Sequence, residues 1–157
     1  MLTKIHINLL KNQADAGDLN SQLELAKIFK EGKGVEPSFS NTLKYYSMAA
    51  RKNHPEALFF IAECQDKGKG MPLSPEYAFQ NYLKAAKQGH VEACIAVGHF
   101  YELGRAAFKD LTKARQFYEY AVSKGSKEAK VKLQNLLSRA SVPLSSVSPL
   151  ERIKSQR

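Results

Sequence analysis

Apolar residues recur three and four positions apart along most of the chain, which is the spacing of one face of an α-helix. Leu25, Ile28 and Phe29 follow this spacing in one such segment. Gly-Lys-Gly triplets at 32–34 and 68–70 interrupt the pattern, and glycine there permits the left-handed backbone that ends a helix. The pattern predicts helices over residues 3–15, 19–31, 39–52, 55–67, 75–87, 91–103, 111–124 and 127–138.

The pattern repeats every 36 residues without an insertion. A two-helix unit of this length cannot bury its apolar face alone, so successive units are expected to stack around one continuous core. Five kinds of position keep their register through at least three periods. They are Gly17, Asn53, Gly89 and Gly125; Gly32, Gly68 and Gly104; Tyr46, Tyr82 and Tyr118; Ala49, Ala85 and Ala121; and Leu25, Ile61, Val97 and Leu133.

Two further registers have a local physical meaning. A short polar residue precedes the second helix of each period, where its side-chain oxygen can accept from an unpaired amide of the first turn. A small residue in the first helix lets two helix axes approach closely beside the tyrosine of the second helix. The predicted N-caps are Ser38, Ser74 and Asp110, and the small residues are Ala26, Ala62 and Gly98.

The third period carries the fullest set of recurring residues. They are Ala93, Val97, Gly98, Tyr101, Gly104, Asp110, Lys113, Ala114, Phe117, Tyr118, Ala121 and Gly125. This pattern resembles the Sel1-like repeat, a relative of the tetratricopeptide repeat, and the resemblance covers residues 17–138. It implies an all-α fold, a right-handed α-α superhelical solenoid of helix pairs. Residues 1–16 are then a capping helix, 17–138 hold three repeats and a half repeat, and 139–157 form a Ser/Pro-rich basic tail.

The chain departs from the family pattern at a few places. Ala106 replaces the second turn glycine, Gln65 the tyrosine of the first helix, Asn53 a terminal glycine and Ser21 the first alanine. These departures question local geometry and leave the fold prediction intact. Cysteine-rich members of the family carry disulfides, but Cys64 and Cys94 occupy different phases of the repeat, so that subgroup is not supported.

The resemblance also implies a function. Sel1-like proteins act as adaptors or scaffolds that hold partner proteins on a concave surface, and many are bacterial proteins of signalling or host interaction. We therefore expect a non-enzymatic protein–protein interaction module, with no cofactor and no small-molecule substrate. The partner's identity and the oligomeric state lie beyond the sequence.

The charge distribution bears on a competing hypothesis. The chain of 157 residues has 43% hydrophobic residues and a formal net charge of +9, of which residues 125–157 carry +5. The alternative is therefore a nucleic-acid or anionic-surface binder that acts through this basic C-terminal segment. A nucleic-acid-binding domain usually carries its basic residues across its folded body, which disfavours this alternative. The tail is open to three interpretations: a solvated end, a segment folded back along the groove, or a short recognition motif.

The sequence also bears on location. It has no apolar run of the roughly 20 residues that a membrane-spanning helix needs and no recognisable secretory signal, so we expect no membrane association. Two cysteines in a chain of this size suggest free buried thiols in a reducing compartment. The predicted location is cytoplasmic, and delivery to a host cell without a signal peptide is compatible with it.

No residue set supports catalysis. The Gly-Lys-Gly triplets lack the spacing of a phosphate-binding loop and follow a helix instead of a strand. His90, Cys94 and His99 are conceivable metal ligands, but His99 is off the face that the other two share. His90 occupies the same position of the 36-residue repeat as Asp18, His54 and Ser126, which is the position before a first helix. Helix capping therefore explains His90 better than metal binding does.

The predicted partner surface consists of first-helix positions at which the repeats differ. Phe60 stands where the other units have Glu, Ala or Lys, so an exposed aromatic anchor is one interpretation. The equally weighted alternative is that Phe60 packs against a neighbouring helix. The predicted partner-binding residues are Glu24, Lys27, Leu58, Phe60, Glu63, His99 and Lys132.

Overall fold

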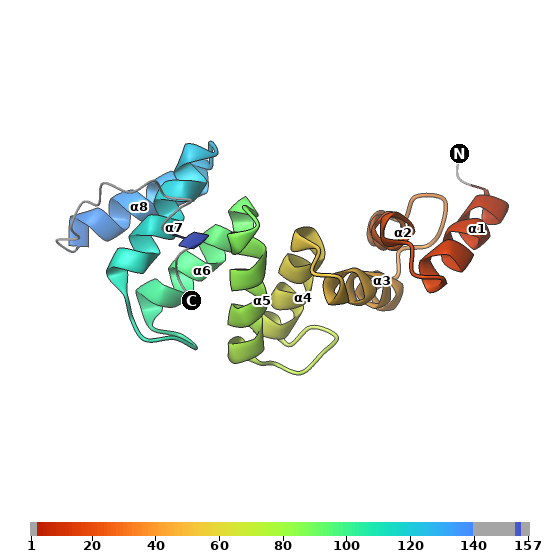
Figure 1. The fold of residues 1–157 in the computed structure, drawn as a ribbon, viewed down its shortest axis with the longest axis horizontal. Helices are drawn as coiled ribbons and strands as arrows, with labels where there is room; N and C mark the ends of the chain where they lie inside the picture. The colour runs from red at the N-terminus through yellow and green to blue at the C-terminus, as the bar shows by residue number, and fades with distance from the viewer. Residues whose placement is uncertain (1–2, 140–152, 155–157) are drawn as a thin grey trace. The chain divides into compact units, whose positions relative to one another are not determined.

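The computed structural model describes residues 3–139 and 153–154, and within these residues the secondary structure consists of α-helices joined by turns and loops, with no strand. Every predicted helix is present, with its ends within a residue or so of the prediction. The helices are α1 (Lys4–Asp15), α2 (Leu19–Glu31), α3 (Phe39–Arg51), α4 (Pro55–Lys67), α5 (Pro75–Lys87), α6 (Val91–Leu103), α7 (Leu111–Ser123) and α8 (Lys127–Arg139) (Figure 1).

The predicted N-caps are confirmed. Ser38, Ser74 and Asp110 each accept a hydrogen bond from the amide three residues further on, at the start of α3, α5 and α7. Each of these residues has extended backbone, as an N-cap requires. Local side-chain chemistry therefore sets where the second helix of every repeat begins.

Two departures from the glycine pattern keep the glycine geometry. Asn53 has φ of 62° where the other repeats have glycine, and Ala106 has φ of 56° at the second turn position. Asparagine tolerates the left-handed region, whereas alanine there is strained because its Cβ approaches the following carbonyl. The repeat geometry therefore outweighs the local preference of residue 106.

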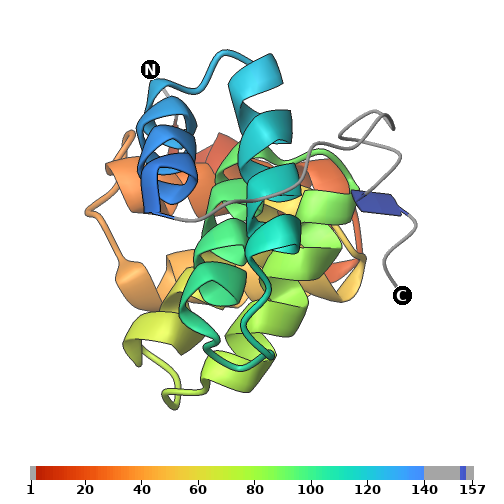
Figure 2. The ribbon, with the colours of Figure 1, turned by 90° about the vertical axis from the view of Figure 1, so that its left-hand side faces the viewer.

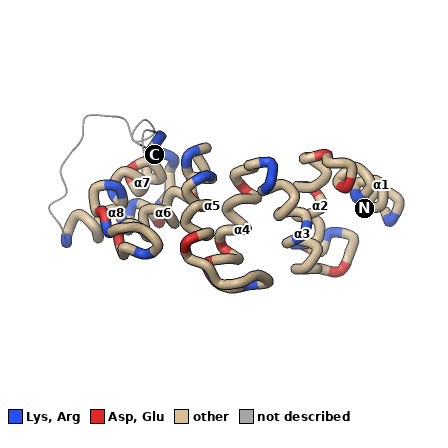
Figure 3. Tube along the Cα trace, turned by 60° about the horizontal axis from the view of Figure 1, so that its bottom comes forward, with Lys and Arg blue, Asp and Glu red and all other residues tan. Residues whose placement is uncertain are grey.

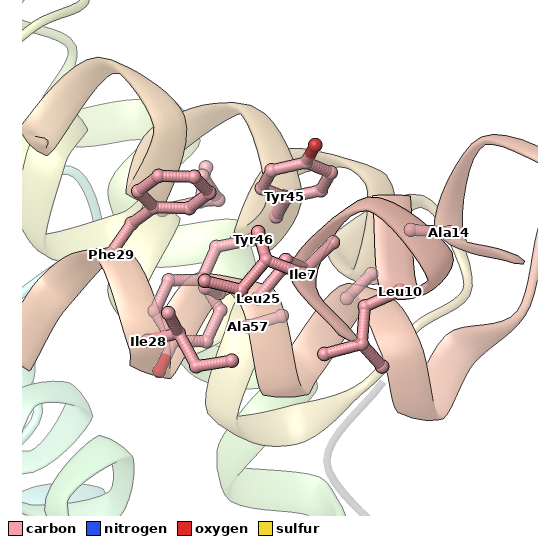
Figure 4. Close-up of a cluster of buried hydrophobic side chains, with 12 residues drawn as sticks. Ile7, Leu10, Ala14, Leu25, Ile28, Phe29, Tyr45, Tyr46 and Ala57 are labelled. Atoms are coloured by element: carbon pink, nitrogen blue, oxygen red, sulfur yellow. The ribbon is translucent and has the colours of Figure 1, made fainter. Parts of the chain in front are cut away.

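The helices form two compact units, residues 1–73 and 74–157. In the first unit α1 packs on α2, α2 on α3 and α3 on α4. Their shared core combines aliphatic, aromatic and alanine side chains from all four helices (Figure 4). Its members are Ile7, Leu10, Ala14, Leu25, Ala26, Ile28, Phe29, Tyr45, Tyr46, Ala49, Ala57 and Ile61.

In the second unit α5 packs on α6, α6 on α7 and α7 on α8 (Figure 2). Aromatic rings dominate this core: Phe79 lies 5.6 Å from Phe100 and 5.3 Å from Tyr101 between ring centroids. Gly98 of α6 faces the fully buried ring of Tyr118 so closely that an added Cβ would lie 2.6 Å from Cε1. The small-residue position thus allows the close approach that the sequence predicted.

Most of the predicted tail lies outside the described residues. Of its apolar residues, the structure describes Ile153, whose side chain is fully buried. Burial of this residue is what the folded-back interpretation requires of it, and the choice among the three interpretations stays a prediction.

Candidate functional site

The seven predicted partner-binding residues all lie on first helices of the repeats. Glu24 and Lys27 are on α2, and Leu58, Phe60 and Glu63 are on α4, all in the first unit. His99 on α6 and Lys132 on α8 belong to the second unit. The candidate surface is therefore considered in two parts, one in each unit.

Leu58 does not belong to this surface. Its side chain is only 4% exposed, and the same phase of the repeat is buried at Gln22 and Cys94. Gln22 donates to the carbonyl of Ala14 on α1, which shows that this phase faces the preceding second helix. The sequence placed Leu58 on the partner side because periodicity alone did not show which neighbouring helix covers it.

Phe60 shows the packing alternative that the sequence analysis kept open. Its ring centroid lies 4.5 Å from that of Tyr46 and 6.2 Å from that of Phe39, both on α3. The ring is partly buried against the first-unit core, and the Lys30 ammonium lies 5.8 Å from its centroid. Phe60 therefore contributes to packing, with only part of its ring left to contact a partner.

The charged residues of the first unit are organised around Glu56. The Glu56 carboxylate accepts a hydrogen bond from the Tyr46 hydroxyl, with 3.0 Å between the oxygens, and lies 3.1 Å from the Lys27 ammonium. Burial acts to raise the pKa of Glu56, but Lys27 and Tyr46 outweigh it and hold the pKa below its usual value. Burial and the nearby carboxylate raise the pKa of Tyr46, so its hydroxyl stays a donor.

Glu24 and Glu63 also have local partners. Glu24 lies 3.7 Å from the His6 imidazole of α1, and Glu63 lies 3.1 Å from Lys67 one turn along α4. Such exposed pairs contribute little stability, typically about 0–1 kcal/mol.

In the second unit, His99 and Lys132 line one small pocket of about 210 Å³ between α6 and α8. We call this the helix-A pocket, and its lining is His99, Glu102, Leu103, Lys132, Asn135 and Arg139. The two predicted residues, far apart in sequence, are thus brought together.

The centre of the helix-A pocket is Glu102, which the sequence analysis missed. Its carboxylate accepts a hydrogen bond from the Tyr118 hydroxyl, with 2.8 Å between the oxygens, and lies 3.6 Å from Arg139 and 4.0 Å from His99. A tyrosine recurs at the position of Tyr118 in each repeat, and a buried tyrosine hydroxyl usually needs a hydrogen-bond acceptor. That requirement was the signal in the sequence that could have pointed to a residue such as Glu102. Burial and this carboxylate raise the pKa of Tyr118.

The conceivable metal ligands have other roles. His90 caps α6, since its Nδ1 accepts a hydrogen bond from the Ala93 amide, with 3.2 Å between the nitrogens. The Cys94 thiol is buried, which raises its pKa to about 12, and it contacts the Ala86 carbonyl at 3.7 Å. Within the described part of the chain, no three His, Cys, Asp or Glu side chains gather closely enough to hold a metal ion.

Capping holds for only part of the His90 phase. Asp18 and Ser126 cap their helices as His90 does, but His54 makes no side-chain cap bond at the start of α4. The expectation of capping was therefore wrong at His54, and Pro55 is not the reason, because Ser74 also precedes a proline and still caps its helix.

Charges of both signs are interspersed along the helices of each unit (Figure 3). None of the helices among the described residues is long and apolar enough to span a bilayer. The exposed surfaces of the first helices are therefore largely polar, with charges of both signs.

The fold and these surfaces define an α-helical repeat protein. A sequence model of the Sel1 repeat matches residues 19–54, 55–90 and 91–126, and the chain belongs to the Sel1 repeat family. No curated protein matches the chain significantly.

Solved structures agree with this assignment. A Sel1 repeat protein from Oxalobacter formigenes is 32% identical, with a TM-score of 0.72 over 80% of this chain and 95% of that protein. The protective antigen c5321 of uropathogenic Escherichia coli is 24% identical, with a TM-score of 0.75 over 86% of this chain and 29% of that protein. The cysteine-rich protein B of Helicobacter pylori is 22% identical, with a TM-score of 0.60 over 81% of this chain and 96% of that protein.

These neighbours place the chain in the class of all-α helical repeat solenoids. Sel1 repeat proteins generally mediate protein–protein interactions and are generally non-catalytic. The fold prediction from the sequence is therefore confirmed, and the functional prediction is confirmed at the level of the family.

Proposed function

We propose that this protein is a non-enzymatic adaptor that binds a partner protein on the exposed face of its first helices. The helix-A pocket is the observation that supports this most strongly, because it joins polar side chains of two repeats around one carboxylate. The exposed Glu24 and Lys27 and the half-buried Glu63 extend the proposed surface in the first unit.

The mechanism is presentation of side chains that are already ordered. Tyr118 and Arg139 hold the Glu102 carboxylate, and Lys132 lies 3.9 Å from Glu128 on the same helix. Ordering a flexible side chain on binding costs about 0.5–1.5 kcal/mol, so residues held in advance lose less entropy. A polar loop or helix of a partner protein suits such a surface better than an apolar ligand does.

The finer predictions about location also belong to this proposal. Cys64 and Cys94 are free and buried, which supports a reducing compartment such as the cytoplasm. The similar solved structures come from bacteria, which supports a bacterial protein. A role in host interaction, or delivery to a host cell, is a further expectation that location measurements in infected cells would test.

The test is affinity capture from a lysate of the source organism with the full chain, at low and high salt. His99→Ala and Lys132→Glu alter the helix-A pocket, and Lys84→Glu on the exposed side of α5 is the matched control. We expect capture of a protein that survives high salt, is weakened by both pocket variants, and is unchanged by the control. Phe60→Ala, accompanied by a stability measurement, tests the first unit.

Two results would contradict the proposal. If the pocket variants and Lys84→Glu weaken capture equally, the first-helix face is not the binding surface. If only nucleic acid or anionic material is retained, and is lost in high salt, counterion release drives binding and the basic-segment alternative is favoured.

A further inference from the structure

The loop between α6 and α7, residues 104–110, carries an exposed apolar side chain, Phe108, that does not line the helix-A pocket. It extends from one end of the α6–α7 pair (Figures 1 and 2). Phe108 is 97% exposed and Leu103, at the end of α6, is 59% exposed. A phenyl ring left in water contributes nothing to folding, so packing does not explain this residue.

The other repeats lack these apolar side chains. The positions that match Leu103 are Glu31 and Lys67, and those that match Phe108 are Glu36 and Pro72. The backbone of the third repeat nonetheless keeps the family turn, even at the strained Ala106. The equivalent loop of the second repeat also exposes an apolar side chain, Leu73, at 63%, so what distinguishes the third repeat is the aromatic ring of Phe108.

The loop also borders an open pocket of about 790 Å³. Its lining includes Tyr101, Leu103, Phe108, Lys109 and Lys113. The Lys113 ammonium lies 5.3 Å from the Tyr101 ring centroid, so the floor combines an aromatic face with a cation. Such a pocket has room for one large apolar side chain of a partner.

The charge around this pocket is positive. The Arg105 guanidinium lies 5.0 Å from the Phe100 ring centroid, and Glu102 and Lys109 share a second, smaller pocket. In the 790 Å³ pocket itself, Lys109 and Lys113 contribute two cations against the single carboxylate of Asp110. The Asp110 carboxylate is already hydrogen-bonded, because as the cap of α7 it accepts from the Lys113 backbone amide at 2.9 Å. The chain's own residues 140–157 are net basic and so do not complement the pocket.

We propose that this loop is a second docking site, which takes an acidic peptide segment carrying one large apolar side chain. The apolar side chain enters the pocket beside Phe108 and Leu103, and the acidic residues face Lys109 and Lys113. The site shares Leu103 with the helix-A pocket, whereas Phe108, Lys109 and Lys113 line this site and not the helix-A pocket. Variants at these three residues therefore test this proposal separately from the first.

The test uses the full chain and a fluorescein-labelled peptide in which glutamates flank a single leucine. Fluorescence anisotropy measures its affinity, together with that of a peptide with alanine for the leucine and one with lysines for the glutamates. Phe108→Ala is the critical variant, and Tyr77→Ala, at another exposed aromatic of the second unit, is its matched control. Lys109→Glu tests the charge, with Lys84→Glu as control.

We expect saturable binding of the glutamate–leucine peptide, weakened roughly tenfold or more by Phe108→Ala and clearly by Lys109→Glu, with both controls unchanged. The alanine and lysine peptides should bind far more weakly. The proposal is overturned if the glutamate–leucine peptide does not bind, if the lysine peptide binds equally well, or if Phe108→Ala and Tyr77→Ala act alike. Sedimentation that shows self-association lost in Phe108→Ala would identify a second copy as the occupant and also overturn it.

Discussion

The contact between Gly98 and Tyr118 gives the sharpest test of how the repeats pack. Replacing a glycine inside a helix by alanine normally stabilises the helix by about 0.8–1 kcal/mol. Here the new Cβ would lie 2.6 Å from Cε1 and 2.8 Å from Cδ1 of Tyr118. Tyr118 has little freedom to retreat, because its ring is fully buried and its hydroxyl is bonded to Glu102.

The two effects oppose each other, and their sizes decide the sign. Overfilling a packed core typically costs about 1–3 kcal/mol. After the gain in helix propensity is subtracted, we expect Gly98→Ala to lower the free energy of unfolding by about 1 kcal/mol. The reverse change in the first unit, Ala26→Gly, should also destabilise, by about 1–2 kcal/mol, from lost propensity and a lost buried methyl.

The assay is urea unfolding of the full chain followed by far-ultraviolet circular dichroism. Hydrogen exchange of α6 and α7 assigns the change to the second unit. In a Tyr118→Leu background the steric conflict is removed, so Gly98→Ala should become stabilising there. If Gly98→Ala stabilises the unaltered chain by the full propensity gain, the proposed tight contact is wrong.

Three further predictions follow from the described residues. Ala106→Gly should stabilise the chain by about 0.5 kcal/mol, because relief of left-handed strain exceeds the added entropy of the unfolded chain. Thermal unfolding measures this, and Asn53→Gly should gain less stability than Ala106→Gly. A lower melting temperature for Ala106→Gly would contradict the prediction. Cys94 should resist a thiol reagent at neutral pH until the protein unfolds, and rapid labelling of the native protein would refute this expectation. Because burial raises the thiol pKa from 9.0 to about 12, the stability associated with the neutral thiol should be lost as the pH rises through this range. The pKa of Glu56 is lowered, so the stability from its pairing is present above the usual glutamate pKa of 4.5 and is lost as the pH falls below it. Acid unfolding curves of Glu56→Gln should therefore depend less on pH in this range than those of the unaltered chain, and identical curves would contradict the assigned pairing.

Much of the architecture could be predicted from the sequence. The helix ends, the caps at Ser38, Ser74 and Asp110 and the recurrence of small residue beside tyrosine all follow from local chemistry repeated at a fixed period. A period of 36 residues without insertions places equivalent residues in equivalent surroundings. The structure predicted for one repeat therefore applies to the others.

The candidate site was less accessible to this reasoning. His99 and Lys132 share a pocket, but Leu58 is buried and Phe60 largely supports the core. The period shows which positions are equivalent, and it does not show which neighbouring helix covers each of them. The surroundings of Leu58 depend on side chains from other helices, which periodicity cannot specify.

Sequence by itself determined that this chain is a stack of Sel1-type helix pairs, because helix formation, capping and turn geometry are set within a few residues. Only the tertiary structure brought Glu102 together with Tyr118 and Arg139, which lie 16 and 37 positions further along the chain. It alone showed that Phe108 is almost wholly exposed. Burial, ion pairing and exposure depend on segments distant in sequence, and those contacts exist only once the helices have packed.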